Sequence, residues 1–127
     1  MDISKLRNGF QVWVEGFAGD SATRILVRHI NQDEFEIIVK GATEHTIDLK
    51  NHQRVGRLNE DKYHELLVDA AVVDWEGFSD SGAPFPCTPE NRRWLMKVST
   101  DFRSMVKDVP LTLEKALALE KDDQIKN

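Results

Sequence analysis

The spacing of apolar residues changes along the chain from a period of two to a period of three and four, and this change limits the possible folds. Every second residue from Phe10 to Val14 is apolar, which is typical of a half-buried strand. The segment 23–28 alternates in the same way, and turn-forming residues 16–21 separate the two. The pattern predicts an antiparallel β-hairpin over about residues 9–29. Because an isolated hairpin is barely stable in water, other elements must cover its apolar face.

Helical segments can supply this cover from residue 31 onward. Asn31 stands three residues before Glu34, an arrangement that caps a helix start. The clearest helix follows Asn59, where apolar residues from 63 to 71 recur at the spacing of a helix packed against a core. A further helix is predicted to begin at Thr88 and Pro89, which combine a capping hydroxyl with proline at the first helical position.

The last third of the chain is also predicted to be helical. Trp94 lies on the apolar face of the helix that begins at Thr88. We expect Pro110 to end the helix that follows, and a last helix to start at Thr112. The helical part is predicted to span about residues 31–119, followed by a frayed polar tail at 120–127. The segment 43–57 has no clear period and could be an extension, a short third strand or a mobile insertion.

The chain of 127 residues has the length of a single domain, predicted to span residues 1–127. We expect an α+β fold in which the N-terminal antiparallel β-hairpin packs on a small bundle of four or five short helices. The formal net charge of −5 falls entirely within residues 59–127, which disfavours nucleic acid as a partner. One cysteine, no long apolar run and no signal-like start favour a protein of the cytoplasm that does not enter membranes.

Several residues are candidates for catalysis or metal binding, and each has a simpler structural interpretation. Asp74 and Glu76 could act as paired carboxylates, but we expect loop acids that accept backbone hydrogen bonds. Asp74 with Asp80 and Gly82 lacks the ligand spacing of a calcium loop. Cys87 as a nucleophile has no neighbour in sequence that would lower its pKa. Zinc ligation is disfavoured because no close pair occurs among the four histidines, which are expected at the surface: His29, His45, His52 and His64.

The segment 72–91 is the most distinctive part of the sequence. It reads Val-Val-Asp-Trp-Glu-Gly-Phe, then a turn containing Asp80-Ser81-Gly82, then Pro-Phe-Pro-Cys-Thr-Pro-Glu-Asn. This order resembles the phage tail assembly chaperones, in which a Val-Val-x-Trp-x-Gly segment and an aspartate–glycine loop precede Phe-Thr-Pro-Glu-Asn at a helix start. The resemblance extends over roughly residues 22–110. The sequence departs from the family pattern in two places. Its segment 43–57 is longer than usual, and Cys87 stands where an aromatic or aliphatic residue is usual.

The resemblance implies a protein without enzymatic activity, metal or cofactor. Such a chaperone would bind the phage tape measure protein and the tail tube protein in the cytoplasm of the bacterial host, and would be absent from the mature virion. A homo-oligomer is compatible with this role. The alternatives are a generic α+β interaction module that binds an unrelated partner and, from another class, a small hydrolase that uses Asp74 or Cys87.

The chaperone interpretation gives the candidate residues two kinds of role, structural support and partner contact. Trp75 is expected to be a core anchor at a bend between two helical segments, with direct partner contact as the alternative. Phe17 at the hairpin tip has no evident cover, so burial and partner contact both stay open. Structural roles are predicted for Trp75, Gly77, Thr88, Pro89 and Trp94. Partner contacts are predicted on the faces of helices 59–71 and 89–98 and in the loop 76–87, with the residues Phe17, Glu76, Phe78, Phe85, Arg92 and Arg93.

Overall fold

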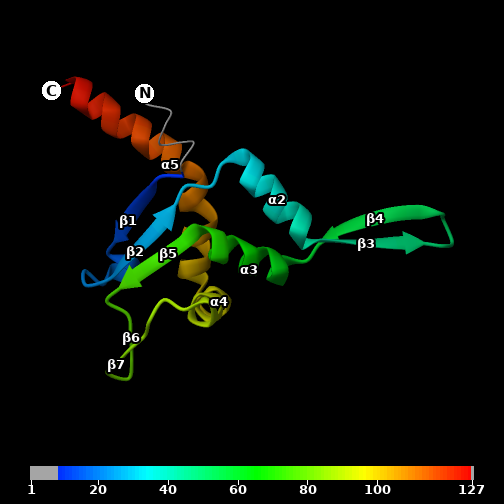
Figure 1. The fold of residues 1–127 in the computed structure, drawn as a ribbon, viewed down its shortest axis with the longest axis horizontal. Helices are drawn as coiled ribbons and strands as arrows, with labels where there is room; N and C mark the ends of the chain where they lie inside the picture. The colour runs from blue at the N-terminus through cyan, green and yellow to red at the C-terminus, as the bar shows by residue number, and fades with distance from the viewer. Residues whose placement is uncertain (1–8, 127) are drawn as a thin grey trace.

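Three antiparallel strands in the order β1-β2-β5 form the central sheet (Figure 1). The structure is a computed structural model that describes the backbone of residues 9–126 and the side chains of residues 9–115. Its strands are β1 (Gln11–Glu15), β2 (Arg24–Arg28), β3 (Thr43–Asp48), β4 (Gln53–Leu58), β5 (Val72–Glu76), β6 (Ser79–Asp80) and β7 (Ala83–Pro84). Its helices are the 3-10 turn η1 (Phe17–Gly19), α2 (Gln32–Ala42), α3 (Glu60–Ala71), α4 (Pro89–Val98) and α5 (Thr100–Lys126).

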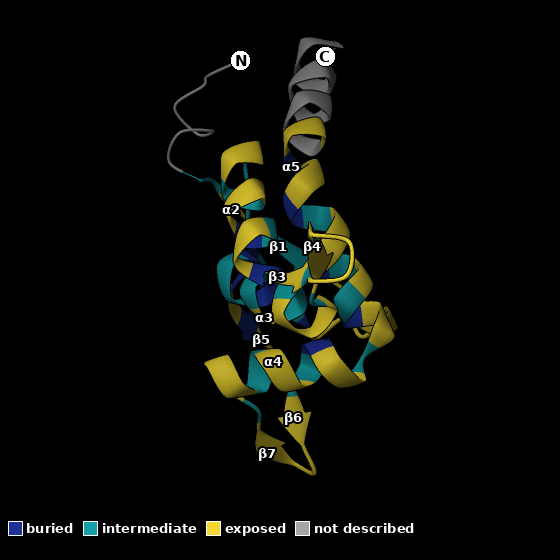
Figure 2. Ribbon diagram, turned by 90° about the vertical axis from the view of Figure 1, so that its right-hand side faces the viewer, coloured by how far each residue is buried: buried dark blue, intermediate teal, exposed yellow. Residues whose placement is uncertain are grey.

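One face of the central sheet packs on the helices. Val14 lies opposite Ile25, and Ile25 lies opposite Trp75, so one apolar row crosses all three strands. Figure 2 shows the buried segments where the strands meet α3, α4 and α5. The core unites Ile25, Val27, Ile30, Ile38, Leu67, Val68, Ala71, Val72, Trp75, Met96, Phe102, Val106 and Leu113. Burial of this apolar surface is the main force that holds hairpin and helices together.

The helix starts predicted from capping residues are confirmed. The Asn31 side chain accepts a hydrogen bond from the Glu34 amide at 2.8 Å. Asn59 accepts one from the Lys62 amide at 3.1 Å, at the start of α3 and just before the apolar stripe begins at residue 63. These side chains satisfy amide groups that a helix start leaves without partners.

The segment 72–76 differs from our expectation, because Trp75 lies in a strand and not at a bend between helices. Residues 72–76 form β5, which pairs with β2 and completes the sheet. The β-branched Val72 and Val73 favour this conformation. The pairing partner lies almost fifty residues earlier in the chain, so a local pattern could not show it.

The prediction that Pro110 ends a helix is wrong. The helix α5 continues through Pro110 to Lys126 and includes most of the segment predicted to be a frayed tail. The Pro110 side chain is almost fully buried, and its carbonyl accepts a hydrogen bond from the Ile30 amide at 3.1 Å. These contacts offset the loss of one helical hydrogen bond, and α5 changes direction along its length without ending (Figure 1).

The segment 43–57, left open by its sequence, forms most of a second hairpin. Strands β3 and β4 pair in register from Thr43 opposite Leu58 to Asp48 opposite Gln53. The hairpin extends far from the rest of the molecule (Figure 1). At its turn, the Asp48 carboxylate accepts hydrogen bonds from the Lys50 amide at 2.9 Å and from Asn51 at 2.8 Å. The segment is therefore two strands and not one.

The expected fold class is confirmed. The described residues contain an N-terminal β-hairpin, antiparallel sheets and four α-helices, which together make an α+β fold. None of these helices is both long enough and apolar enough to cross a lipid bilayer.

Candidate protein-binding site

A continuous series of aromatic rings leads from the core to the surface. Neighbouring ring centroids lie 5.0 to 6.1 Å apart, within the usual range for interacting aromatic side chains. The series contains Phe17, Trp75, Phe78, Phe85, Trp94 and Phe102. It joins the hairpin loop, β5, the loop after it, α4 and α5, and it contains every aromatic residue among the predicted structural and partner-contact residues.

Trp75 stands at the centre of this series and is buried, as expected of a core anchor. Its side chain is 6% exposed. The indole Nε1 donates a hydrogen bond to the Phe85 carbonyl at 2.7 Å, and the two rings are stacked at 5.8 Å. The hydrogen bond satisfies the one polar atom of the ring while the loop closes over it. Trp75 thus fixes the loop 76–87 against the sheet.

The phenylalanines predicted to contact a partner pack partly against the other rings of this series. Phe17 lies 6.0 Å from the Phe78 ring and 6.0 Å from the Phe102 ring, so the hairpin loop does have cover. Phe17, Phe78 and Phe85 are all half-buried at the rim of the core. A partner could contact only their outer edges, and their role in binding stays a prediction.

The turn after β5 depends on Gly77. Its φ is +84°, and a Cβ built at this position would lie 2.1 Å from the Ala22 carbonyl oxygen. No side chain fits there without moving backbone, so the sheet and the loop can approach each other only through glycine. At the far end of the loop, the Thr88 hydroxyl accepts a hydrogen bond from the Asn91 amide at 3.1 Å, and Pro89 occupies the first turn of α4. These local geometries fit the structural roles predicted for all three residues.

Trp94 is the outermost ring of the series, and it is more exposed than a residue on an apolar helix face should be. Its side chain is 54% exposed, although its ring lies 5.7 Å from Phe85. It borders a groove of about 510 Å³ between α3, α4 and the start of α5. The groove is lined by Glu60, Asp61, His64, Glu65, Arg93, Trp94, Met96, Lys97 and Arg103.

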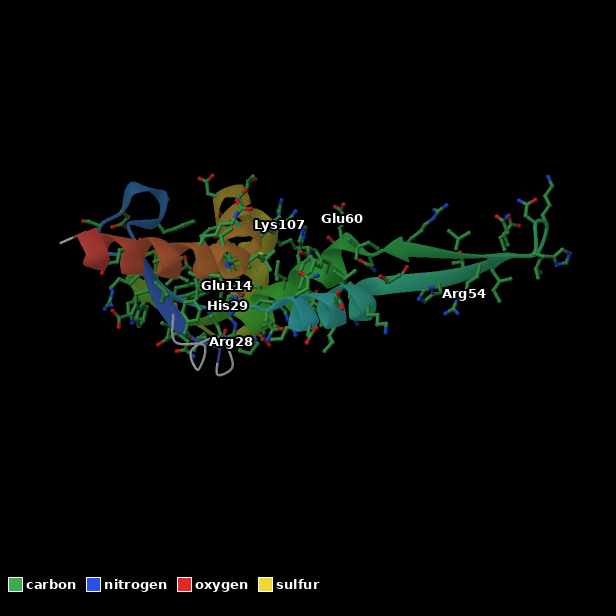
Figure 3. All side chains as sticks on the ribbon, turned by 90° about the horizontal axis from the view of Figure 1, so that it is seen from above. Arg28, His29, Arg54, Glu60, Lys107 and Glu114 are labelled. Atoms are coloured by element: carbon green, nitrogen blue, oxygen red, sulfur yellow. The ribbon has the colours of Figure 1, made fainter. Side chains whose placement is uncertain are left out.

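Opposite charges line the two sides of this groove. The α3 side carries Glu60, Asp61 and Glu65, and the other side carries Lys97 and Arg103. Figure 3 shows Glu60 and Lys107 in the same region. Burial lowers the pKa of His64 below its ordinary value, and the nearby Lys107 and Arg103 act in the same direction. A neutral imidazole therefore adds no positive charge to the groove near pH 7.

The adjacent arginines Arg92 and Arg93, predicted to contact a partner, are engaged within the protein. Arg93 pairs with Asp69 of α3 at 2.6 Å, which joins α4 to α3. Arg92 donates a hydrogen bond to the Cys87 carbonyl at 3.1 Å. Burial raises the pKa of the Cys87 thiol despite this neighbour, so the thiolate that a nucleophile requires is disfavoured.

The carboxylates Asp74 and Glu76 lie on the sheet and not in a loop. They stand two residues apart on β5, on the face turned away from the core. The Asp74 carboxylate accepts a hydrogen bond from the Trp75 amide at 2.8 Å, and Glu76 pairs with Arg24 at 3.3 Å. Within the described residues, no group of three or more potential ligands could hold a metal ion, and this applies to the loop with Asp80 and Gly82.

The prediction of surface histidines is wrong for His29. This residue is 2% exposed, stacks on Phe10 with ring centroids 5.1 Å apart and places Nε2 3.3 Å from a Glu114 carboxylate oxygen. Figure 3 shows His29 and Glu114 side by side between β2 and α5. The hairpin and the distant helix bury the ring together, which a local pattern could not indicate. His45 and His52 are exposed and His64 is half-buried.

Sequence reasoning missed two surface features that the structure brings out. Trp13 lies on the outer face of the sheet, where the Arg24 guanidinium stands 4.2 Å from the centre of its ring. Ile37 and Ile47 are 69% and 72% exposed, on α2 and β3 respectively. Ile38 of α2 is buried, and the helical period that turns it towards the core turns Ile37 outward, so this period was the available signal.

The fold and the sites define a class of protein rather than a particular family. Comparison with protein family models, with curated proteins and with solved structures finds no match to this chain. What is shown is an α+β protein with a half-exposed tryptophan beside a groove of opposite charges.

Proposed function

We propose that this protein is a non-enzymatic phage tail assembly chaperone that binds the tape measure protein and tail tube subunits in the bacterial host cytoplasm. The resemblance of segment 72–91 supports the choice of client. In the structure this segment comprises β5, the loop that closes on Trp75 and the start of α4. The segment that carries the resemblance therefore ends at the helix that presents Trp94.

The single observation that carries a binding role is the exposure of Trp94 beside the groove. An indole ring that is 54% exposed leaves a large apolar area in contact with water. Tryptophan is enriched among the residues that dominate binding energy, because covering it on a partner recovers this area. The Phe85 ring behind it limits its movement, so less side-chain entropy is lost on binding.

The charges along the groove indicate how a client segment would be oriented. A segment with cationic side chains towards α3 and anionic side chains towards Lys97 and Arg103 fits the two sides. Complementary charges of this kind increase the rate of association and disfavour wrong orientations. A long helical client with exposed apolar surface aggregates before assembly, and reversible cover of that surface keeps it soluble.

Co-expression with a fragment of a phage tape measure protein tests the proposal. The soluble fraction of the fragment should rise in the presence of the wild-type chain. The variant Trp94→Ala should lose most of this effect, whereas Trp13→Ala, which removes an indole from the far side of the sheet, should retain it. A fragment that stays as insoluble with the wild-type chain as without it would count against the chaperone role.

A further inference from the structure

The projecting hairpin of residues 43–58, here named the arm, has two chemically different faces. Residues directly opposite each other in an antiparallel pair lie on the same face. One face carries Thr43, His45, Ile47, Arg54, Gly56 and Leu58, and the other carries Glu44, Thr46, Asp48, Gln53, Val55 and Arg57. Both acidic side chains of residues 43–58 thus lie on the second face. The first face, named the Ile47 face, combines apolar residues with Arg54.

The Ile47 face continues into a groove along α2. The groove measures about 660 Å³ and is lined by Asp33, Phe35, Glu36, Ile37, Val39, Lys40, Thr43 and His45. Because Thr43 and His45 also belong to the Ile47 face, groove and face form one surface that runs from α2 onto the arm. Exposed apolar side chains occur on both halves of it, since Ile37 is 69% and Ile47 is 72% exposed.

Charge is ordered along this surface. The acidic residues Asp33 and Glu36 lie in the half that belongs to α2, with Asp33 near its far end. Arg54 lies near the far end of the other half, well out on the arm (Figure 3). Lys40 stands near the middle, three residues before Thr43. The surface therefore changes from acidic at one end to basic at the other, with one exposed isoleucine in each half.

The two halves also match in length. From Asp33 to Thr43 the helix rises by roughly 15 Å at 1.5 Å per residue. From Thr43 to Asp48 the strand extends by roughly 17 Å at 3.3 Å per residue. A half-turn about an axis near Thr43 would therefore place the acidic end of one such surface over the basic end of an identical one.

We propose that two copies of this chain associate through this surface. In the pair, Arg54 of each copy meets Asp33 and Glu36 of the other, and Ile47 of each copy covers Ile37 of the other. A twofold interface requires a surface that complements itself, so that each contact occurs twice. The surface meets this requirement because its two halves are similar in length, one end is acidic and the other basic, and an apolar residue lies on each side of the midpoint.

A second copy also accounts for apolar side chains on an arm that has little core of its own. A two-stranded hairpin is marginally stable in water. Ile47 and Leu49 are 72% and 79% exposed, so burial of their side chains adds little to the stability of the arm. Cover by a partner removes this apolar area from water. The same contacts bring Arg54 of the partner copy to the carboxylates of Asp33 and Glu36 at the rim of the interface.

Sedimentation velocity of the full chain over a range of concentrations tests the proposal. The wild-type protein should shift with increasing concentration from 14.6 kDa to twice that mass. Ile47→Asp and Arg54→Glu should each raise the dimer dissociation constant by about tenfold or more. The matched variant Arg57→Glu makes the same charge change on the opposite face and should leave the constant within about threefold of wild type.

A charge exchange distinguishes direct pairing from general disturbance of the arm. In the double variant Arg54→Glu with Glu36→Arg, each copy again presents opposite charges to the other, so the dissociation constant should return towards the wild-type value. Circular dichroism confirms that each variant is folded. A wild-type protein that stays at 14.6 kDa at every concentration, or a dimer that Ile47→Asp and Arg54→Glu both leave intact, would overturn the proposal.

Discussion

The body of the protein, here residues 9–42 and 59–115, and the arm are stabilised in different ways. The body buries a shared core in which Ile25, Leu67 and Phe102 are fully inaccessible to solvent. The arm has no buried residue between positions 44 and 58, and its strands contact mainly each other. In Figure 2, where the arm points towards the viewer, its residues are coloured mainly as exposed, whereas buried segments lie within the body.

This difference indicates where substitutions should affect stability and where they should affect binding. Apolar burial dominates folding free energy, so the body should respond strongly to the loss of a core side chain. The arm should tolerate substitutions of exposed residues, which rarely change stability by more than about 0.5 kcal/mol. Folding therefore places little constraint on the exposed side chains of the arm, which can serve association instead.

The largest effect is expected from Trp75→Ala in the body. Removing the ring leaves a cavity at the centre of the aromatic series and should lower the free energy of unfolding by about 3–5 kcal/mol. The matched change Trp94→Ala removes a half-exposed ring and should cost less than about 1 kcal/mol. Urea denaturation measures both. Equal losses would show that burial does not separate the two positions.

The second effect concerns the turn that joins sheet and loop. Gly77→Ala combines a positive φ with a Cβ 2.1 Å from the Ala22 carbonyl oxygen, and should cost about 2–4 kcal/mol. Gly82→Ala is the control, since its φ of +86° is similar but nothing lies within 4 Å. Its cost should be about 1 kcal/mol, from backbone conformation alone. Thermal unfolding of the pair separates the clash from the backbone term.

A smaller, pH-dependent effect is expected from Glu34. Hydrogen bonds from Arg28, at 2.6 and 3.0 Å, hold the pKa of this carboxyl below its ordinary value. Because the folded-state pKa is lowered, the stabilisation is complete above about pH 4.3 and is lost as pH falls through the lowered pKa. Glu34→Gln should cost less than about 1 kcal/mol at pH 7, since the pair is partly exposed. Melting curves from pH 7 to pH 3 should converge with those of wild type.

The smallest effect on stability is expected from shortening the arm. Replacing residues 46–55 by Asn-Gly joins His45 to Gly56, which are directly opposite in the hairpin, through a favourable two-residue turn. The monomer should unfold within about 0.5 kcal/mol of wild type when measured at high dilution, because the arm contributes no buried residue to the core. A large loss would show that the arm supports the body.

Local sequence patterns predicted the elements whose signals lie within one segment. The alternation of Phe10 and Val14 identified the first hairpin, and Asn31 and Thr88 identified two helix starts. These depend on neighbouring residues only, so sequence spacing is sufficient. The capping hydrogen bonds are present as expected.

Features that depend on distant partners were not predictable in the same way. β5 forms because β2 offers a free edge, and Pro110 stays within α5 because the body buries its ring. His29 is buried for a similar reason, between the first hairpin and the last helix. Of the candidate site, the sequence identified Trp94 but neither its exposure nor the groove beside it, because both depend on how α3 and α4 pack.

The arm leaves and re-enters the body at one place. Thr43 lies opposite Leu58, and the Asn59 amide donates a hydrogen bond to the Ala42 carbonyl at 2.8 Å. Two neighbouring points on the body thus suffice to anchor everything between them. A foreign peptide grafted at this junction, such as an epitope or a fluorophore-bearing loop, would leave the remaining framework undisturbed. Natural insertions or deletions could likewise lengthen or shorten the arm with little consequence for the rest of the molecule.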